Sequence, residues 1–181
     1  MEPTSRRRAL QIIGASGALA PSALAFRQRL AMAGGHVLTT AENAILDAAT
    51  ERIIPADEHS GGARAALVAP FLDHLLAARI DKTKQRWRAG LQAFDKESRR
   101  QTGKAFTSLN PQAQDAVLAS LAKAEAAPAS EGELFFVELK AATIEAYYTT
   151  DIGIHQELGY VGNVARDHFD GCTHPEHWGK K

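Results

Sequence analysis

The sequence is poor in cysteine, in net charge and in the alternating pattern of β-strands. Its 181 residues include one cysteine, so no disulfide can form within the chain. Lys and Arg total 21, as do Asp and Glu, and the two signs are interspersed. That balance argues against nucleic acid or an anionic membrane as the main partner. No glycine-rich motif follows a predicted strand, which excludes dinucleotide-binding and phosphate-loop folds.

Helical periodicity is abundant instead. Hydrophobic residues make up 45% of the chain, which is enough for one substantial core and one main domain. Apolar residues recur at a 3.6-residue spacing in every central segment, and the short connections favour antiparallel neighbours. We therefore expect an all-α bundle of about five helices with a long irregular C-terminal arm. The expected helices cover residues 40–54, 65–80, 82–100, 111–127 and 131–149.

Signals for helix ends support these boundaries. Thr39 and Glu42 form a capping box at the start of the first helix, and Pro55 ends that helix. Asn110 is expected to cap the fourth helix, and Gly103 suits the position just after the third. The chain thus divides into a leader (1–25), a helical bundle domain (26–150) and a C-terminal docking arm (151–181).

The leader has the three parts of an export signal. Arg6, Arg7 and Arg8 form a basic region, residues 9–24 are apolar, and residues 23–25 match a small-residue cleavage site. The apolar region is shorter than the roughly 20 residues that a membrane span needs, so we expect cleavage and no membrane anchor. Adjacent arginines and a mildly apolar core are typical of a twin-arginine signal, and an ordinary secretory signal is the alternative.

The twin-arginine route carries proteins that are already folded, often with a cofactor in place. No recognisable cofactor site occurs in this sequence. The leader therefore indicates that a folded partner is exported to the periplasm together with this chain.

Chemically distinctive residues gather in the C-terminal arm. This part of the chain contains the single cysteine and four of the seven histidines, together with glycines that permit tight folding. Aromatic anchors separated by polar residues are typical of protein interfaces. The alternative is that the arm packs on its own bundle. The expected partner-binding residues are Tyr160, Gly162, Asn163, Phe169, Cys172, His174, Pro175, His177 and Trp178.

Two groups of residues raise the question of a metal site. His168, Cys172, His174 and His177 have suitable donor atoms, but their spacing matches no common zinc signature. We interpret them as interface residues, with a stand-alone periplasmic metal-binding protein as the competing function. The loop residues 57–59 (Asp-Glu-His) are interpreted as a solvated turn, with a metal site as the alternative. No catalytic residue is assigned.

Four motifs resemble one known family, the gluconate 2-dehydrogenase subunit 3 family. They are Leu38-Thr39-x-x-Glu42, the segment 51–57 (ERIIPAD), Gly159-Tyr160-x-Gly162-Asn163 and the segment 171–178 (GCTHPEHW). The resemblance implies a non-catalytic small subunit of a periplasmic, membrane-associated sugar dehydrogenase. In such complexes a large glucose-methanol-choline-type subunit binds FAD, and a multihaem cytochrome c subunit passes electrons towards quinone.

The resemblance also implies an escort role, in which this chain supplies the export signal that the flavoprotein lacks and aids its maturation. FAD and haem c would then belong to the partners, with no cofactor in this chain. Two interpretations of Cys172 remain open: an intersubunit disulfide with the flavoprotein, or a buried thiol that only packs. Gluconate, glucose, glucosides and lactose all occur as substrates in this family, and the large subunit selects among them.

Overall fold

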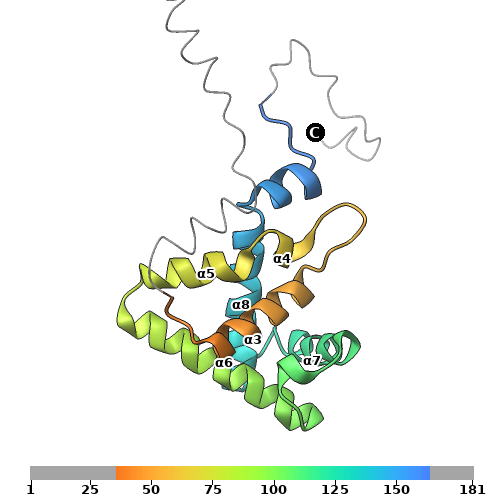
Figure 1. Cartoon of the computed structure of the whole chain (residues 1–181). Helices are drawn as coiled ribbons and strands as arrows, with labels where there is room; N and C mark the ends of the chain where they lie inside the picture. Colours follow the sequence, from red (N-terminus) through yellow and green to blue (C-terminus); the bar gives the residue numbers. More distant parts are fainter. Residues whose placement is uncertain (1–35, 164–181) are drawn as a thin grey trace, which may run out of the picture.

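The computed structural model describes residues 36–163, and this part of the chain is all-α with no strand (Figure 1). The prediction of a helical bundle is confirmed. Six α-helices form the bundle: α3 (Thr40–Ile53), α4 (Gly62–Ala65), α5 (Val68–Ala77), α6 (Asp81–Thr102), α7 (Pro111–Lys123) and α8 (Glu131–Tyr147). A 3₁₀ turn at Phe106–Ser108 precedes α7, and a π-helical turn at Ile152–Glu157 follows α8. Within this range no helix combines the length and apolarity that a membrane span requires.

The predicted helix ends are present. Thr39 accepts a hydrogen bond from the Glu42 backbone N–H, and the Glu42 carboxylate accepts one from the Thr39 N–H at 2.8 Å. The same carboxylate accepts from the Arg88 side chain of α6 at 3.1 Å, so the cap also joins two helices. The Asn110 side chain accepts from Ala113 at the start of α7. Gly103 ends α6 with a positive φ of 76°.

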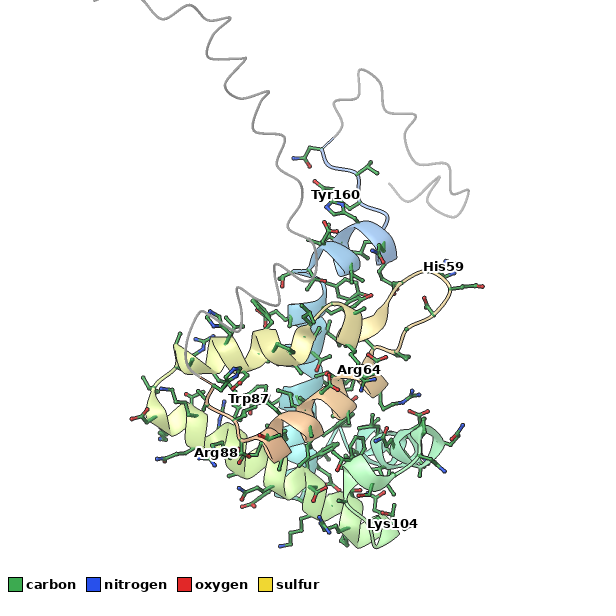
Figure 2. The ribbon with its side chains drawn as sticks, viewed as in Figure 1. His59, Arg64, Trp87, Arg88, Lys104 and Tyr160 are labelled. Carbon is green, nitrogen blue, oxygen red and sulfur yellow. The ribbon has the colours of Figure 1, made fainter. Side chains whose placement is uncertain are left out.

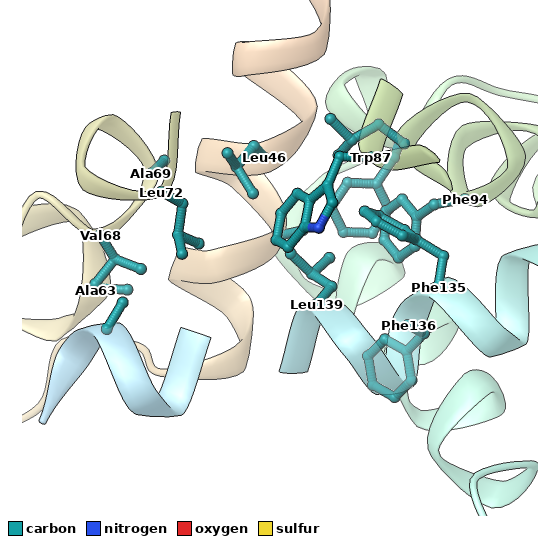
Figure 3. Close-up of a cluster of buried hydrophobic side chains, with 14 of the residues drawn as sticks. Leu46, Ala63, Val68, Ala69, Leu72, Trp87, Phe94, Phe135, Phe136 and Leu139 are labelled. Atoms are coloured by element: carbon teal, nitrogen blue, oxygen red, sulfur yellow. The ribbon is translucent and has the colours of Figure 1, made fainter. Parts of the chain in front are cut away.

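The core lies where α8 packs against the other helices, and the most extensive contact of α8 is with α6. Figure 3 shows core side chains of both helices, among them Trp87 and Phe135. Trp87 of α6 packs edge-to-face on Phe135 of α8, with ring centroids 5.5 Å apart. A side-chain carbon at Gly90 would lie 2.1 Å from the Phe135 ring. A glycine there lets the two helices approach closely enough to bury both aromatic rings.

One predicted helix is divided in two. The expected helix over 65–80 is interrupted at Leu67, which has a left-handed φ of 58°, and α5 begins at Val68 and ends at Ala77. The residues from Ala66 to Ala69 are all buried. Four consecutive residues cover most of the circumference of a helix, so one continuous helix could not bury them all against one neighbour. The break allows α4 and α5 to bury different faces.

A buried carboxylate ties the beginning of the described chain to the bundle. Asp73 of α5 is 1% exposed and accepts hydrogen bonds from the backbone N–H groups of Val37 and Leu38, each at 3.0 Å. The Asn43 side chain and the His36 ring also contact this carboxylate. The bundle therefore has a fixed entry point just after the N-terminal segment.

Candidate functional site

One end of the bundle brings together two segments that are distant in the sequence, the loop 54–61 and residues 148–163. Figure 2 shows His59 of the loop and Tyr160 at this end, opposite Lys104. The buried Tyr147 hydroxyl at the end of α8 donates a hydrogen bond to Ser60 of the loop at 2.8 Å. Desolvation, only partly offset by this bond, raises the Tyr147 pKa. We call this region the loop–arm end.

The loop is a compact turn held by the side chain of Asp57. Asp57 accepts hydrogen bonds from the backbone N–H groups of Ser60 and His59, each at 2.8 Å. These bonds hold the Asp57 pKa below its ordinary value, because they favour the charged carboxylate. Its carboxylate thus has the role expected in a solvated turn. No group of three or more side chains placed to hold a metal occurs within residues 36–163.

The first part of the predicted irregular arm is in fact helical. Ile152–Glu157 forms a π-helical turn, and Ile152 packs against the core. A side-chain carbon at Gly153 would lie 2.2 Å from the Tyr147 carbonyl oxygen. Only glycine allows this contact between the turn and the end of α8. Residues 158–163 have no regular structure, as predicted.

Residues 154–163 fold back on themselves, and we call them the hook. The Tyr160 carbonyl oxygen lies 2.6 Å from His155 Nδ1. A carbonyl can only accept, so Nδ1 donates the proton of this bond. The two rings are stacked with a centroid separation of 6.5 Å. The Tyr160 hydroxyl donates to the Asn163 side chain at 2.7 Å. The hook thus holds its central aromatic residue in one orientation.

The hook presents apolar side chains to solvent. Leu158 is 61% exposed, Tyr160 47% and Val161 88%. Together with their neighbours they line a shallow hollow of about 560 Å³. No residue between 158 and 163 is charged. A preorganised, uncharged aromatic and aliphatic surface is suited to binding another protein.

Three of the predicted partner-binding residues, Tyr160, Gly162 and Asn163, lie together in the hook. The others, from Phe169 to Trp178 and including Cys172, lie outside the described residues, as do His168 and the leader arginines. The sequence interpretation missed His155, which holds Tyr160 in place, and the exposed pair Leu158 and Val161. The exposure of Leu158 and Val161 could have been predicted, because both flank a Gly-Tyr pair in a non-helical segment.

Comparison with known proteins identifies a family for this chain. The model of the family described as gluconate 2-dehydrogenase subunit 3 matches residues 40–164. The matched region begins at α3 and includes the whole hook, but it stops before the motif at 171–178. The searches of curated proteins and of solved structures found no match.

Proposed function

Because this chain belongs to the gluconate 2-dehydrogenase subunit 3 family, we propose that it is the non-catalytic small subunit of a periplasmic FAD-dependent sugar dehydrogenase. In this role it escorts the flavoprotein subunit through export and stabilises it afterwards. The observation that supports the proposal most strongly is the family match, which covers the bundle and the hook together. The family name describes a subunit of a gluconate 2-dehydrogenase complex. The escort role, the periplasmic location and the cofactors of the partners are parts of the proposal.

The loop–arm end supports a binding role. The hook is fixed by two hydrogen bonds, one that His155 donates to the Tyr160 carbonyl and one that the Tyr160 hydroxyl donates to Asn163. Little conformational freedom is therefore lost when a partner covers it. Its exposed Leu158 and Val161 would be removed from water by the same contact.

The catalytic chemistry is assigned to a large glucose-methanol-choline-type subunit that binds FAD. A third, multihaem cytochrome c subunit would accept the electrons and associate the complex with the membrane.

The export role depends on the leader and can be tested apart from the chemistry. We expect that changing Arg6, Arg7 and Arg8 to lysine leaves the co-expressed flavoprotein and its activity in the cytoplasm. The matched control changes Arg27 and Arg29 to lysine, which keeps the charge and leaves the leader intact. Undiminished periplasmic activity of the leader variant would contradict the escort role.

Co-purification distinguishes this function from the competing one. A small subunit is expected to purify with the flavoprotein and to be less stable alone. A stable monomer that contains stoichiometric metal would instead favour the metal-binding protein with His168, Cys172, His174 and His177 as ligands.

Non-reducing electrophoresis of the purified complex tests the Cys172 disulfide, because a mixed disulfide gives a band with the summed mass of both chains.

A further inference from the structure

Helix α8 has a second apolar face that points away from the core. Its exposed residues are spaced three, four, three and four positions apart, which places them in one row along the helix. We call this row the α8 stripe. It consists of Leu134, Val137, Ala141, Ile144 and Tyr148, the last lying directly after the helix.

The opposite face of α8 is buried in the bundle. Phe135, Leu139 and Tyr147 are each less than 5% exposed, whereas Leu134 in the α8 stripe is 55% exposed. A helix that is apolar on both faces is typical of one buried on both sides. The bundle covers one face, and no element within residues 36–163 covers the other. The second face therefore has the composition of an interface.

Charged residues border the α8 stripe; two of them are paired within the chain, whereas Glu145 is exposed and enters no ion pair among the described residues. On one side Lys140 contacts both carboxylate oxygens of Glu125 at 2.9 Å. On the other side Glu138 accepts from Arg86 at 2.6 Å and from the Trp87 indole at 2.8 Å. The stripe itself contains no charge. An apolar centre with a polar rim is the usual anatomy of a protein–protein interface, and it requires an apolar surface opposite.

A groove extends the α8 stripe sideways. It has a volume of about 560 Å³ and lies between α5, α6 and α8. Apolar residues line it on the α5 side (Phe71, Leu75) and on the α8 side (Ala141, Ala142). Charged side chains also line it: Arg79, Arg86, Glu138 and Glu145. Ala141 belongs to both the groove and the stripe, so the two form one surface. A protruding apolar side chain of a partner could enter the groove while its neighbours cover the stripe.

The α8 stripe also leads along the chain to the loop–arm end. From Leu134 to Tyr148 it extends about 21 Å, at 1.5 Å per residue. Tyr148 packs edge-to-face on Tyr147, whose hydroxyl contacts the loop, and the hook follows within a few residues. One partner could therefore cover the stripe and the hook together. A second copy of this chain seated only on the stripe would leave the hook exposed.

We infer that the α8 stripe and its groove form a second contact surface for the catalytic subunit, in which an apolar surface of that subunit covers the stripe. This inference rests on the proposed function, because it takes the catalytic subunit as the partner. It extends the binding surface from the hook to the length of α8.

Site-specific photo-crosslinking in the full co-expressed complex tests the inference. A photoreactive benzoylphenylalanine is placed at position 144, at position 160 in the hook, or at the exposed position 119 of α7 as a control. We expect adducts with the catalytic subunit from positions 144 and 160 and none from position 119.

Other crosslinking results would refute either the inference or the proposed function. An adduct between two copies of this chain at position 144 would assign the α8 stripe to self-association, and an adduct only within one chain would assign it to the chain's own residues. An adduct from position 160 without one from position 144 would refute the inference and leave the proposed function standing. Failure of the two subunits to purify together would refute the proposed function itself.

A charge placed in the α8 stripe gives an independent measurement. Ile144→Glu adds a charge at an exposed helical position, so the fold should remain and its helical circular dichroism should match that of the control Ala119→Glu. We expect the affinity for the catalytic subunit to fall about tenfold or more in Ile144→Glu and to be unchanged in the control. Equal affinities for the two variants would refute the inference.

Discussion

The α6–α8 interface and the loop–arm end are both ordered, but by different means. Between α6 and α8 large aromatic and aliphatic side chains are buried, and their contacts stabilise the bundle. At the loop–arm end a few hydrogen bonds and two closely packed glycines, Gly61 and Gly153, fix the backbone, while apolar side chains remain exposed. The comparison assigns the stability of the chain to the first region, and the proposed function assigns partner binding to the second.

Removing a core ring should have the largest effect on stability. Phe94 is fully buried and packs on Phe106 with ring centroids 4.9 Å apart. Phe94→Ala is expected to lower the free energy of unfolding by about 3–5 kcal/mol, because it leaves a cavity as well as losing apolar burial. Leu158→Ala in the hook should change it by less than about 0.5 kcal/mol. Denaturant unfolding measures both variants, and comparable losses would contradict the division between the two regions.

The loop–arm end should be most sensitive to substitution at Gly153, which packs against the Tyr147 carbonyl. Gly153→Ala places a carbon 2.2 Å from the Tyr147 carbonyl oxygen, so the π turn must shift. We expect a loss of about 1–3 kcal/mol, most of it from local opening. Amide hydrogen exchange should be faster at Leu158, which bonds to the Gly153 carbonyl, and at Tyr160, which bonds to that of Ile154. Amides in the middle of α6 should exchange as in the wild type, and uniform acceleration would show that the two regions unfold together.

The helices of the bundle could be predicted from sequence because their causes are local. The Thr39–Glu42 capping box, the Asn110 cap and the glycine after α6 are each visible within a few residues, and the structure confirms all three. The exposed aromatic residue of the hook was also predicted, since Tyr160 lies between two glycines in a non-helical segment.

Long-range contacts could not be predicted in the same way. The break at Leu67 depends on which helices surround four consecutive buried residues, and the π turn depends on the contact of Gly153 with the end of α8. The pairing of Tyr147 with Ser60 joins residues 87 positions apart in the sequence. The α8 stripe could not be identified from the sequence, because its apolar residues have the same helical spacing as the buried row of α8. Only the packing of neighbouring helices shows which apolar row of α8 is covered.

Acid should affect the bundle more than the loop. Arg100 and Gln101 donate to the Glu97 carboxylate and lower its pKa to about 2. A lowered pKa stabilises the fold above the ordinary value near 4.5, and this contribution is lost as pH falls towards 2. Glu97→Gln should therefore be about 1 kcal/mol less stable at pH 6, since Arg100 is largely exposed, and the difference should vanish near pH 2. Asp57→Asn in the loop should show a smaller pH dependence, and unfolding curves across this range measure both.

The smallest effect on stability should accompany a large effect on binding. Tyr160→Ala removes a half-exposed ring whose contacts lie within the hook, so the free energy of unfolding should change by less than about 0.5 kcal/mol. The same change removes an aromatic anchor, and binding to the flavoprotein should weaken by at least about tenfold. Tyr160→Phe keeps the ring but loses the hydroxyl that donates to Asn163, so it should retain most of the affinity if the ring is the anchor. Because the bundle is untouched in both variants, a loss of stability that matches the loss of binding would mean that the hook belongs to the core and is no separate binding surface.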